Sequence, residues 1–246
     1  MYTTLMIELK GVGKVYGKKA GTFTALENID LEIAQGASVA IVGKSGPGKS
    51  TLMHVMSGLD HATAGSIKIN GTSLRDMKQK SMDRFRATEM SFIFQSFFIE
   101  PRQTCYQNVV LPLEIAEVPR RMRKQMVKDA LEAVELSDKT NTLANNMSGG
   151  QKQRLAIARS IVNKPKLIFA DEPTGNLDSV TGEKIMGLLF DLNKSLGCTL
   201  IIVTHDHDLA ARCQTQVYVK DGRIEKITQA SVKPRHAAPR GKINVL

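Results

Sequence analysis

The apolar positions of this 246-residue chain follow two patterns, short continuous runs and longer stretches with helical spacing. The run ASVAIV at 37–42 is short and partly β-branched, which is typical of a buried strand, and TLMHVMSGL at 51–59 has helical spacing. A second strand-like run lies at 167–170, and helical stretches lie at 120–136 and 151–162. Strands that alternate with helices predict an α/β fold.

No apolar run approaches the roughly eighteen residues that a membrane-spanning helix requires. The longest candidates, TLIIV and VVLPL, are of strand length, and the opening MYTTLMIELK lacks a basic segment followed by an apolar one. With 42% hydrophobic and 24% charged residues, the composition suits one globular domain that carries a smaller subdomain. We therefore expect a soluble protein that is not exported.

The net charge of +10 is concentrated in two segments. RRMRKQMVK at 120–128 lies on an expected helix, and we interpret it as a solvated helix face. The tail at 229–246 is basic and contains two prolines, which indicates a flexible end with a minor attraction to anionic membrane surfaces. The cysteines, Cys105, Cys198 and Cys213, are widely separated, which favours packing in a reducing compartment over disulfides or a zinc site.

The segment GKSGPGKST, between the first strand and its helix, fits the phosphate-loop pattern G-x-x-x-x-G-K-[ST]. Its specified positions are Gly43, Gly48, Lys49 and Ser50. Glycines let backbone amides approach an anion, and the start of the following helix adds its dipole. Lys49 is then expected to reach the β- and γ-phosphates, and the Ser50 hydroxyl to reach Mg²⁺. Pro47 has no N–H, so it could remove one phosphate contact from the loop.

Two carboxylates follow the strand at 167–170, where a phosphate-loop protein requires them. Asp171 is at the expected carboxyl end of this strand, the edge at which open α/β sheets bind ligands. We expect Asp171 to hold Mg²⁺ and Glu172 to act as general base toward an attacking water. A guanine-binding N-K-x-D segment is not present, because the sequence offers only NKPK and NKSL.

The segment MSGGQKQR at 147–154 precedes these carboxylates. Here the sequence resembles the ATP-binding-cassette (ABC) family, whose signature is L-S-G-G-Q, with Met147 in place of leucine. Ser148 and the Gly149 and Gly150 amides open an expected helix whose dipole can face a phosphate. The resemblance extends from about 5 to about 227. Within it, Tyr16 matches the adenine-stacking aromatic.

Further family elements follow in order along the chain. Gln95 in SFIFQSFF matches the Q-loop glutamine, Asn176 to Asp178 match the D-loop, and His205 matches the switch histidine that contacts the γ-phosphate. By this resemblance the catalytic residues are Glu172, His205, Gln95 and Lys49, and the Mg²⁺ ligands are Ser50, Gln95 and Asp171. The expected ATP-binding residues are Tyr16, Gly43, Lys44, Ser45, Gly46, Pro47, Gly48, Lys49, Ser50, Thr51, Ser148, Gly149, Gly150, Gln151 and Asp178.

The resemblance also implies an architecture. It predicts a phosphate-loop α/β core over 1–228, with an amino-terminal antiparallel β subdomain and a helical subdomain inserted at about 96–161. Two copies are expected to face each other head to tail, so that each ATP lies between the phosphate loop of one copy and the signature of the other. The signature then stabilises charge on the γ-phosphate in trans.

The block DEPTGNLDSVTGEKIMGLL resembles the ATPases of lipoprotein release, macrolide export and cell division. We therefore expect an ATPase subunit on the cytoplasmic face of the membrane that drives a permease encoded as another chain. The stretch IEPRQTCYQNVVLPL departs from the sequence of that subfamily at the place where a permease would dock. This departure bears on which permease is the partner and not on whether ATP is bound. Met147 is a nearly volume-conserving replacement of leucine, which we expect to be tolerated.

Two alternatives belong to other classes of protein. A soluble ABC ATPase acting on nucleic acid or the ribosome would suit the charge of +10, but such proteins carry paired cassettes or a long coiled coil. The chain shows one cassette and no sustained heptads, so no nucleic acid is expected. A regulator that binds ATP without hydrolysing it is disfavoured by the presence of Glu172, Gln95 and His205.

Overall fold

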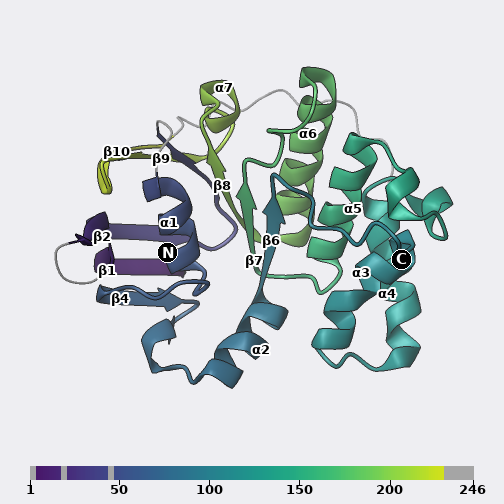
Figure 1. The fold of residues 1–246 in the computed structure, drawn as a ribbon, viewed down its shortest axis with the longest axis horizontal. Helices are drawn as coiled ribbons and strands as arrows, with labels where there is room; N and C mark the ends of the chain where they lie inside the picture. Colours follow the sequence, from purple (N-terminus) through teal and green to yellow (C-terminus); the bar gives the residue numbers. More distant parts are fainter. Residues whose placement is uncertain (1–3, 18–20, 44–46, 230–246) are drawn as a thin grey trace.

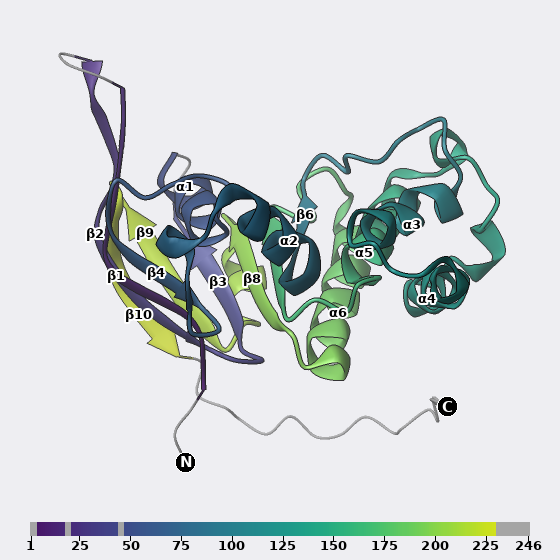
Figure 2. The same ribbon diagram turned by 90° about the horizontal axis from the view of Figure 1, so that it is seen from below.

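Two β-sheets and a group of helices make up the fold in the computed structural model, which describes residues 4–17, 21–43 and 47–229. The sheets lie side by side at one end, and α3, α4 and α5 form the other end (Figures 1 and 2). The predicted α/β phosphate-loop architecture with an antiparallel β subdomain and an inserted helical subdomain is confirmed. The limits expected for these subdomains stay predictions.

The smaller sheet is antiparallel and has the strand order β2-β1-β4-β5. It comprises β1 (Leu5–Tyr16), β2 (Phe23–Ala34), β4 (Ala64–Ile69) and β5 (Thr72–Ser73). Alternate side chains of β1 and β2 are buried, as expected for a sheet with one face toward the core.

The larger sheet has six strands in the order β10-β9-β3-β8-β7-β6. Its strands are β3 (Ser38–Val42), β6 (Met90–Phe94), β7 (Leu167–Asp171), β8 (Thr199–Thr204), β9 (Thr215–Lys220) and β10 (Arg223–Gln229). All neighbouring pairs are parallel except β9 with β10.

The central strands end in register along one edge of this sheet. Val42 of β3 pairs with Thr204 of β8, Val203 pairs with Asp171 of β7, and Asp171 pairs with Phe94 of β6. The residues that follow each strand therefore leave the sheet at the same edge, which is where parallel sheets bind ligands.

The α-helices connect these strands, and α3 and α4 pack with α5 at the end away from the smaller sheet. The helices are α1 (Pro47–Met56), α2 (Gln79–Glu89), α3 (Cys105–Ile115), α4 (Arg120–Ala133), α5 (Gly149–Ile161), α6 (Ser179–Leu196) and α7 (His207–Ala210). The apolar run VVLPL, although of strand length, lies in α3, because that helix continues through Pro112.

The central strands are buried on both faces, which explains why their sequences are continuous apolar runs. Val39 and Ile41 of β3 pack into the core layer that includes α1 and the smaller sheet. Ala40 and Val42 of the same strand pack into the layer that includes α3, α5 and α6. A slip of one residue would exchange these two sets of side chains between the layers.

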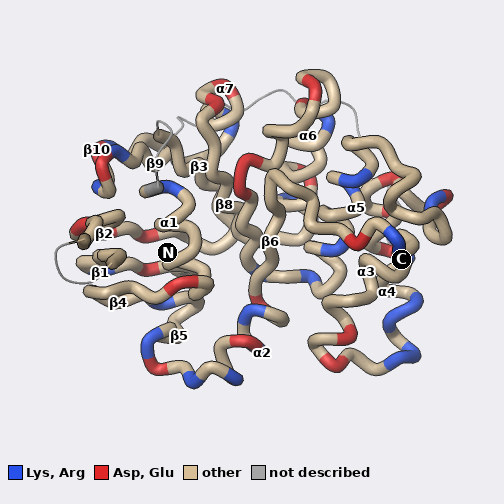
Figure 3. The backbone as a smooth tube through the Cα atoms, in the orientation of Figure 1, with Lys and Arg blue, Asp and Glu red and all other residues tan. Residues whose placement is uncertain are grey.

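The basic segment at 120–128 lies on α4, as predicted. Its positive residues follow one another along the helix at the lower right of Figure 3. Arg120, Arg121, Lys124 and Lys128 are exposed, whereas Val127 on the opposite face is fully buried. The interpretation as a solvated helix face is therefore confirmed. The basic tail lies outside the described residues, among which no helix is both long and apolar enough to cross a bilayer.

The three cysteines are fully buried free thiols, as the sequence indicated. Burial raises the pKa of the Cys198 thiol to about 11 and that of Cys213 to about 12, and it also raises the pKa of Cys105. A raised pKa leaves little of the reactive thiolate at neutral pH.

We expect all three thiols to react slowly with Ellman's reagent at pH 7.5 in the folded protein and at the rate of free cysteine in denaturant. The measurement is the absorbance of the released thiol with time. Reaction of any cysteine at the rate of an exposed thiol in the folded protein would contradict the packing described above.

Candidate functional site

The phosphate loop joins β3 to α1, as the sequence predicted. Gly43 follows the strand directly, and a side chain there would collide with the carbonyl oxygen of Val219. Helix α1 begins at Pro47. The first position of a helix is the one that best accepts a residue without an N–H. The predicted binding residues Lys44, Ser45 and Gly46 lie outside the described residues.

The first turn of α1 meets the carboxyl end of β7. Lys49 and Thr51 are buried in this turn, and the Ser50 hydroxyl lies near enough to the Asp171 carboxylate to lower the pKa of that carboxyl. Burial raises the pKa of Asp171 and the neighbouring Glu172 raises it further, whereas His54, Lys49 and Ser50 act in the opposite sense. The structure thus brings together two of the three predicted Mg²⁺ ligands, Ser50 and Asp171, which are 121 positions apart in the sequence.

Glu172 and His205, both predicted as catalytic, are in direct contact. Nδ1 of His205 lies 2.8 Å from Oε1 of Glu172, and the Thr204 hydroxyl lies 3.5 Å from Oε2. The backbone of Glu172 has a φ of 45°, a conformation that costs a non-glycine residue on the order of 1 kcal/mol. Hydrogen bonds from the Glu172 amide to Val203 and from the Gly175 amide to Glu172 hold it there.

Gln95 follows β6 and faces the D-loop. The Asn176 side chain donates to the Gln95 carbonyl at 3.0 Å, and Nε2 of Gln95 lies 3.4 Å from the Asn176 side-chain oxygen. Gln95, His54, Phe98 and Asp171 line an open pocket of about 540 Å³, together with Phe94 and Ser96. Gln95 therefore lies beside the predicted Mg²⁺ site.

Helix α5 touches both loops that carry predicted catalytic residues. The Arg159 guanidinium donates to the carbonyls of Phe97 and Phe98, at 3.0 and 2.6 Å, just beyond Gln95. The fully buried Gln153 donates to the carbonyl of Pro173 at 2.6 Å, next to Glu172. Sequence reasoning missed Arg159 and Gln153, because their partners are loops distant along the chain.

The signature residues begin α5 at a separate place in the molecule. Ser148 caps the helix and forms a reciprocal capping box with Gln151. Ser148, Gly149, Gly150 and Gln151 line a pocket of about 740 Å³ together with Asp178, and no phosphate-loop residue of the described part lines it. Asp178 caps α6 by accepting a hydrogen bond from the Thr181 amide at 3.0 Å. Within one chain, the two predicted halves of the nucleotide site are apart.

The departures from the family pattern at Cys105 and Met147 touch each other. The buried Cys105 thiol lies 3.4 Å from the Met147 sulfur, a contact between a weak donor and a weak acceptor. Backbone hydrogen bonds from Ala144 to Gln103 and from Cys105 to Thr142 join the same two segments. The unusual stretch after Gln95 is thus packed against the segment that leads into the signature.

Tyr16, the predicted adenine-stacking residue, ends β1 and is 37% exposed. Its hydroxyl donates to Asp60 at 2.7 Å, and Lys14 donates to the same carboxylate. Sequence reasoning missed both partners. Asp60 is 44 positions from Tyr16, and nothing in the local pattern marks it.

The arrangement as a whole suits phosphate chemistry. A buried lysine, a hydroxyl and two adjacent carboxylates converge at one sheet edge, and a histidine contacts the second carboxylate. Hydroxyl and carboxylate oxygens are ligands that Mg²⁺ accepts while keeping several waters.

Comparison with known proteins identifies relatives over nearly the full length. Residues 26–175 match the ABC transporter family model. The chain is 41% identical to the lipoprotein-releasing system ATP-binding protein LolD of Bacteroides fragilis, over 89% of this chain and 100% of that protein. It is 37% identical to the bacitracin export ATP-binding protein BceA of Halalkalibacterium halodurans, over 89% and 87%. The dimeric cassette MJ0796 bound to ADP and Pi superposes with a TM-score of 0.83 at 38% identity, covering 92% and 99%.

We expect Met147→Leu to change the free energy of unfolding by less than about 1.5 kcal/mol, because the volume of the side chain is nearly conserved. Met147→Ala is the matched control and should cost about 2 to 5 kcal/mol, since it leaves a cavity beside Cys105. Urea unfolding followed by circular dichroism measures both. A leucine variant as unstable as the alanine variant would show that the sulfur contact is required.

Proposed function

This chain belongs to the ATP-binding cassette (ABC) transporter family, and we propose how its residues carry out the ATP hydrolysis that drives such a transporter. Its relatives are ATP-binding subunits, and it is an ATPase subunit of the same kind. A soluble ATPase acting on nucleic acid is not favoured. The observation that carries the proposal is the contact of Glu172 with His205, directly after Asp171 at the end of β7.

In the proposed site, Lys49 and the amides at the start of α1 bind the β- and γ-phosphates. Ser50, Asp171 and Gln95 would hold Mg²⁺, and their oxygen donors fit that ion. When bound, Mg²⁺ neutralises charge on the phosphate oxygens. Burial and Glu172 raise the pKa of Asp171, so an added positive charge beside this carboxylate would be stabilising, which supports the proposal.

Glu172 is the proposed general base. Its carboxylate accepts the proton of the attacking water, and it already contacts His205 just beyond the end of β7. His205, which contacts the carboxylate through Nδ1, has its other ring nitrogen available for the γ-phosphate. Gln95 would orient the same water from the neighbouring loop.

We propose that two copies form the complete site. The signature pocket of one copy lies apart from its own phosphate loop, so Ser148 and the amides of Gly149 and Gly150 are placed for a nucleotide held by a second copy. The structurally similar cassette MJ0796 is itself a dimer with ADP and Pi. Such an arrangement lets ATP bring the copies together and hydrolysis separate them.

We expect Glu172→Gln to reduce the rate of ATP hydrolysis by at least about 100-fold, because amide nitrogen and oxygen do not accept the proton from water. The variant should also form an ATP-dependent dimer, measured by light scattering after size exclusion. Glu183→Gln, at an exposed glutamate paired with Arg212, is the matched control and should behave as the wild type. Hydrolysis at the wild-type rate by Glu172→Gln would exclude Glu172 as the base, and a monomer with bound ATP would exclude the paired site.

We further propose that the partner is an integral membrane permease in a separate chain, and that this chain works at the cytoplasmic face of the membrane. The surface at Phe98, next to the unusual stretch that follows Gln95, is the proposed docking place. Phe98 is 68% exposed and has a φ of 47°. LolD and BceA, the relatives named above, suggest a permease for lipoprotein release or export.

We expect Phe98→Ser to weaken retention of a membrane protein on the tagged chain when both are purified from detergent-solubilised membranes of the native organism. The physical reason is the loss of an exposed apolar anchor. Met122→Ser is the control, since Met122 is exposed on α4, in the same group of helices. Equal recovery of the membrane protein with all three forms would place the docking surface elsewhere.

A further inference from the structure

One carboxylate holds the end of β1, where the predicted adenine-stacking ring lies. Asp60 accepts a hydrogen bond from the Lys14 ammonium at 2.6 Å on one oxygen and from the Tyr16 hydroxyl at 2.7 Å on the other. Lys14 and Tyr16 are two positions apart in a strand, so their side chains leave on the same face. The Lys14 side chain is 9% exposed and that of Asp60 is 30% exposed, which limits screening of the pair by solvent.

The same lysine covers one side of the Tyr16 ring. Its ammonium nitrogen lies 4.6 Å from the ring centroid, a distance typical of a cation–π contact. The ring is therefore held at its hydroxyl by Asp60 and against one face by Lys14. With 37% of Tyr16 exposed, a part of the residue is still available to a ligand.

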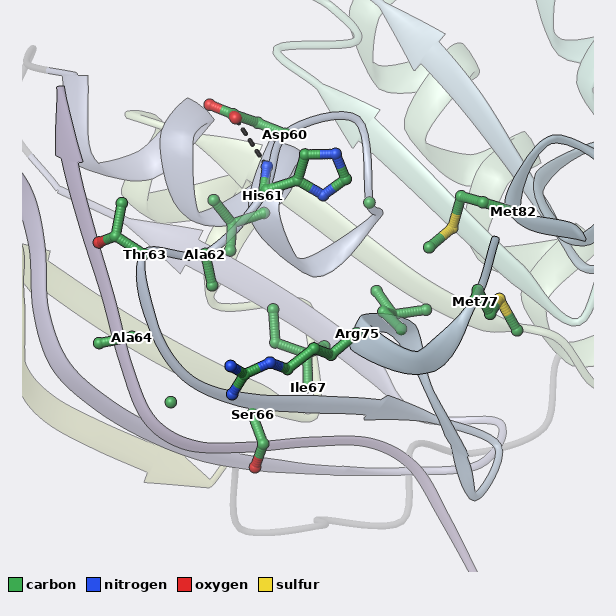
Figure 4. A pocket seen from close by; sticks show the side chains of 14 residues that line it. Asp60, His61, Ala62, Thr63, Ala64, Ser66, Ile67, Arg75, Met77 and Met82 are labelled. Carbon is green, nitrogen blue, oxygen red and sulfur yellow. Dashed lines mark hydrogen bonds between the residues drawn. The ribbon is translucent and has the colours of Figure 1, made fainter. Parts of the chain in front are cut away.

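Asp60 is in turn fixed to the helix that begins at the phosphate loop. Its amide donates to the carbonyl of His54 in the last turn of α1, at 3.1 Å. Its carboxylate also accepts from the His61 amide at 2.7 Å, at the rim of a pocket of about 270 Å³ (Figure 4). Lys14 of β1 also donates to the His61 carbonyl at 2.8 Å, so a second hydrogen bond joins β1 to the segment that follows α1.

A second set of hydrogen bonds secures the backbone of the strand end. The Val15 amide donates to the Thr63 hydroxyl at 3.2 Å, and the Thr63 amide donates to the Gly13 carbonyl at 2.9 Å. Removal of the Tyr16 hydroxyl or the Asp60 charge would thus leave the strand attached while releasing the ring.

The pKa shifts of Asp60 and Tyr16 agree with a phenol that donates a hydrogen bond to an ionised carboxylate. Burial by itself would raise the pKa of Asp60, but the hydrogen bonds from Lys14, Tyr16 and the His61 amide together hold it below its ordinary value. Burial and the bond to Asp60 raise the pKa of the Tyr16 phenol, against a smaller lowering by Thr51 of α1. At neutral pH the acceptor is ionised and the phenol keeps its proton.

We propose that Asp60 and Lys14 are positioning residues, which fix the Tyr16 ring relative to the phosphate loop so that the adenine of ATP stacks on a ring already in place. This inference rests on the role proposed for Tyr16. A ring held in its binding position loses less conformational freedom when the base arrives, so the bonds to Asp60 strengthen ATP binding.

The test compares two probes that share phosphates and differ in the base, ATP and inorganic tripolyphosphate, each with Mg²⁺. Dissociation constants are measured by calorimetry on the full chain and on Asp60→Asn, Tyr16→Phe and Tyr16→Ala. Asp30→Asn is the matched control, because Asp30 also accepts a hydrogen bond from β1, at Gly11. Tyr16→Phe removes only a hydroxyl and keeps the experiment decisive if Asp60→Asn unfolds.

We expect Asp60→Asn and Tyr16→Phe each to weaken ATP binding about three- to tenfold and to leave tripolyphosphate binding unchanged. In hydrolysis, KM for ATP should rise by a similar factor at constant kcat. The double variant should lose less affinity for ATP than the product of the two single effects, because both changes break the bond between Tyr16 and Asp60. Asp30→Asn should bind both probes as the wild type does.

Two outcomes overturn the inference by itself. One is that Tyr16→Ala weakens ATP binding while Tyr16→Phe and Asp60→Asn bind ATP as the wild type does. The other is that these two variants lose affinity for ATP and tripolyphosphate equally, which would show a general structural role. If instead Tyr16→Ala binds ATP normally, the proposed role of Tyr16 fails, and the positioning role fails with it.

Discussion

The register of the parallel strands at the centre of the larger sheet is the constraint on which the candidate site depends. Val42, Thr204 and Asp171 end three adjacent strands within one residue of the same level, and Phe94 ends the fourth. Because these strands are buried on both faces, a shift of one residue would turn every side chain into the wrong core layer. Core packing therefore fixes where the phosphate loop and the catalytic loops leave the sheet.

At this edge of the sheet two negative charges, the carboxylates of Asp171 and Glu172, are close together. Different neighbouring residues interact with each of them. Asp171 and Glu172 are consecutive, but Lys49 and Ser50 lower the pKa of Asp171, whereas Glu172 has a left-handed backbone conformation and contacts His205. The division of the pair between two sets of partners underlies the two roles proposed for them, metal binding and proton transfer. Two consecutive residues within a strand would also have side chains on opposite faces of the sheet. Glu172 differs because it lies in the loop after the strand, and loops are on the surface.

Helix α5 gives the molecule a mechanical connection between its two half-sites. It begins at the signature, and along its length Gln153 holds the loop after Glu172 while Arg159 holds the loop after Gln95. Met147, just before the helix, packs on Cys105. A movement of the helical group would be passed to the loops after Gln95 and Glu172, because α5 is hydrogen-bonded to both. This connection fits a cycle in which hydrolysis and a permease influence each other.

The sequence by itself determined the elements and the chemistry. Glycine spacing marked the phosphate loop, apolar runs marked β3, β7 and β8, and the acids and histidine after those runs marked the sheet edge. These signals are local, since backbone freedom, strand burial and helix capping act over a few neighbouring residues. The run VVLPL shows the limit of such signals, because its length suits a strand and its surroundings made it part of a helix.

Only the tertiary structure decided which side chains meet. Three sets of contacts join distant segments of the chain. They are the hydrogen bonds of Asp60 with Lys14 and Tyr16, the hydrogen bond of Arg159 to the loop after Gln95, and the contact of Cys105 with Met147. No periodicity or motif encodes such pairs, because they arise from the packing of whole elements against one another. The separation of the signature from the phosphate loop in one chain was likewise decided by that packing.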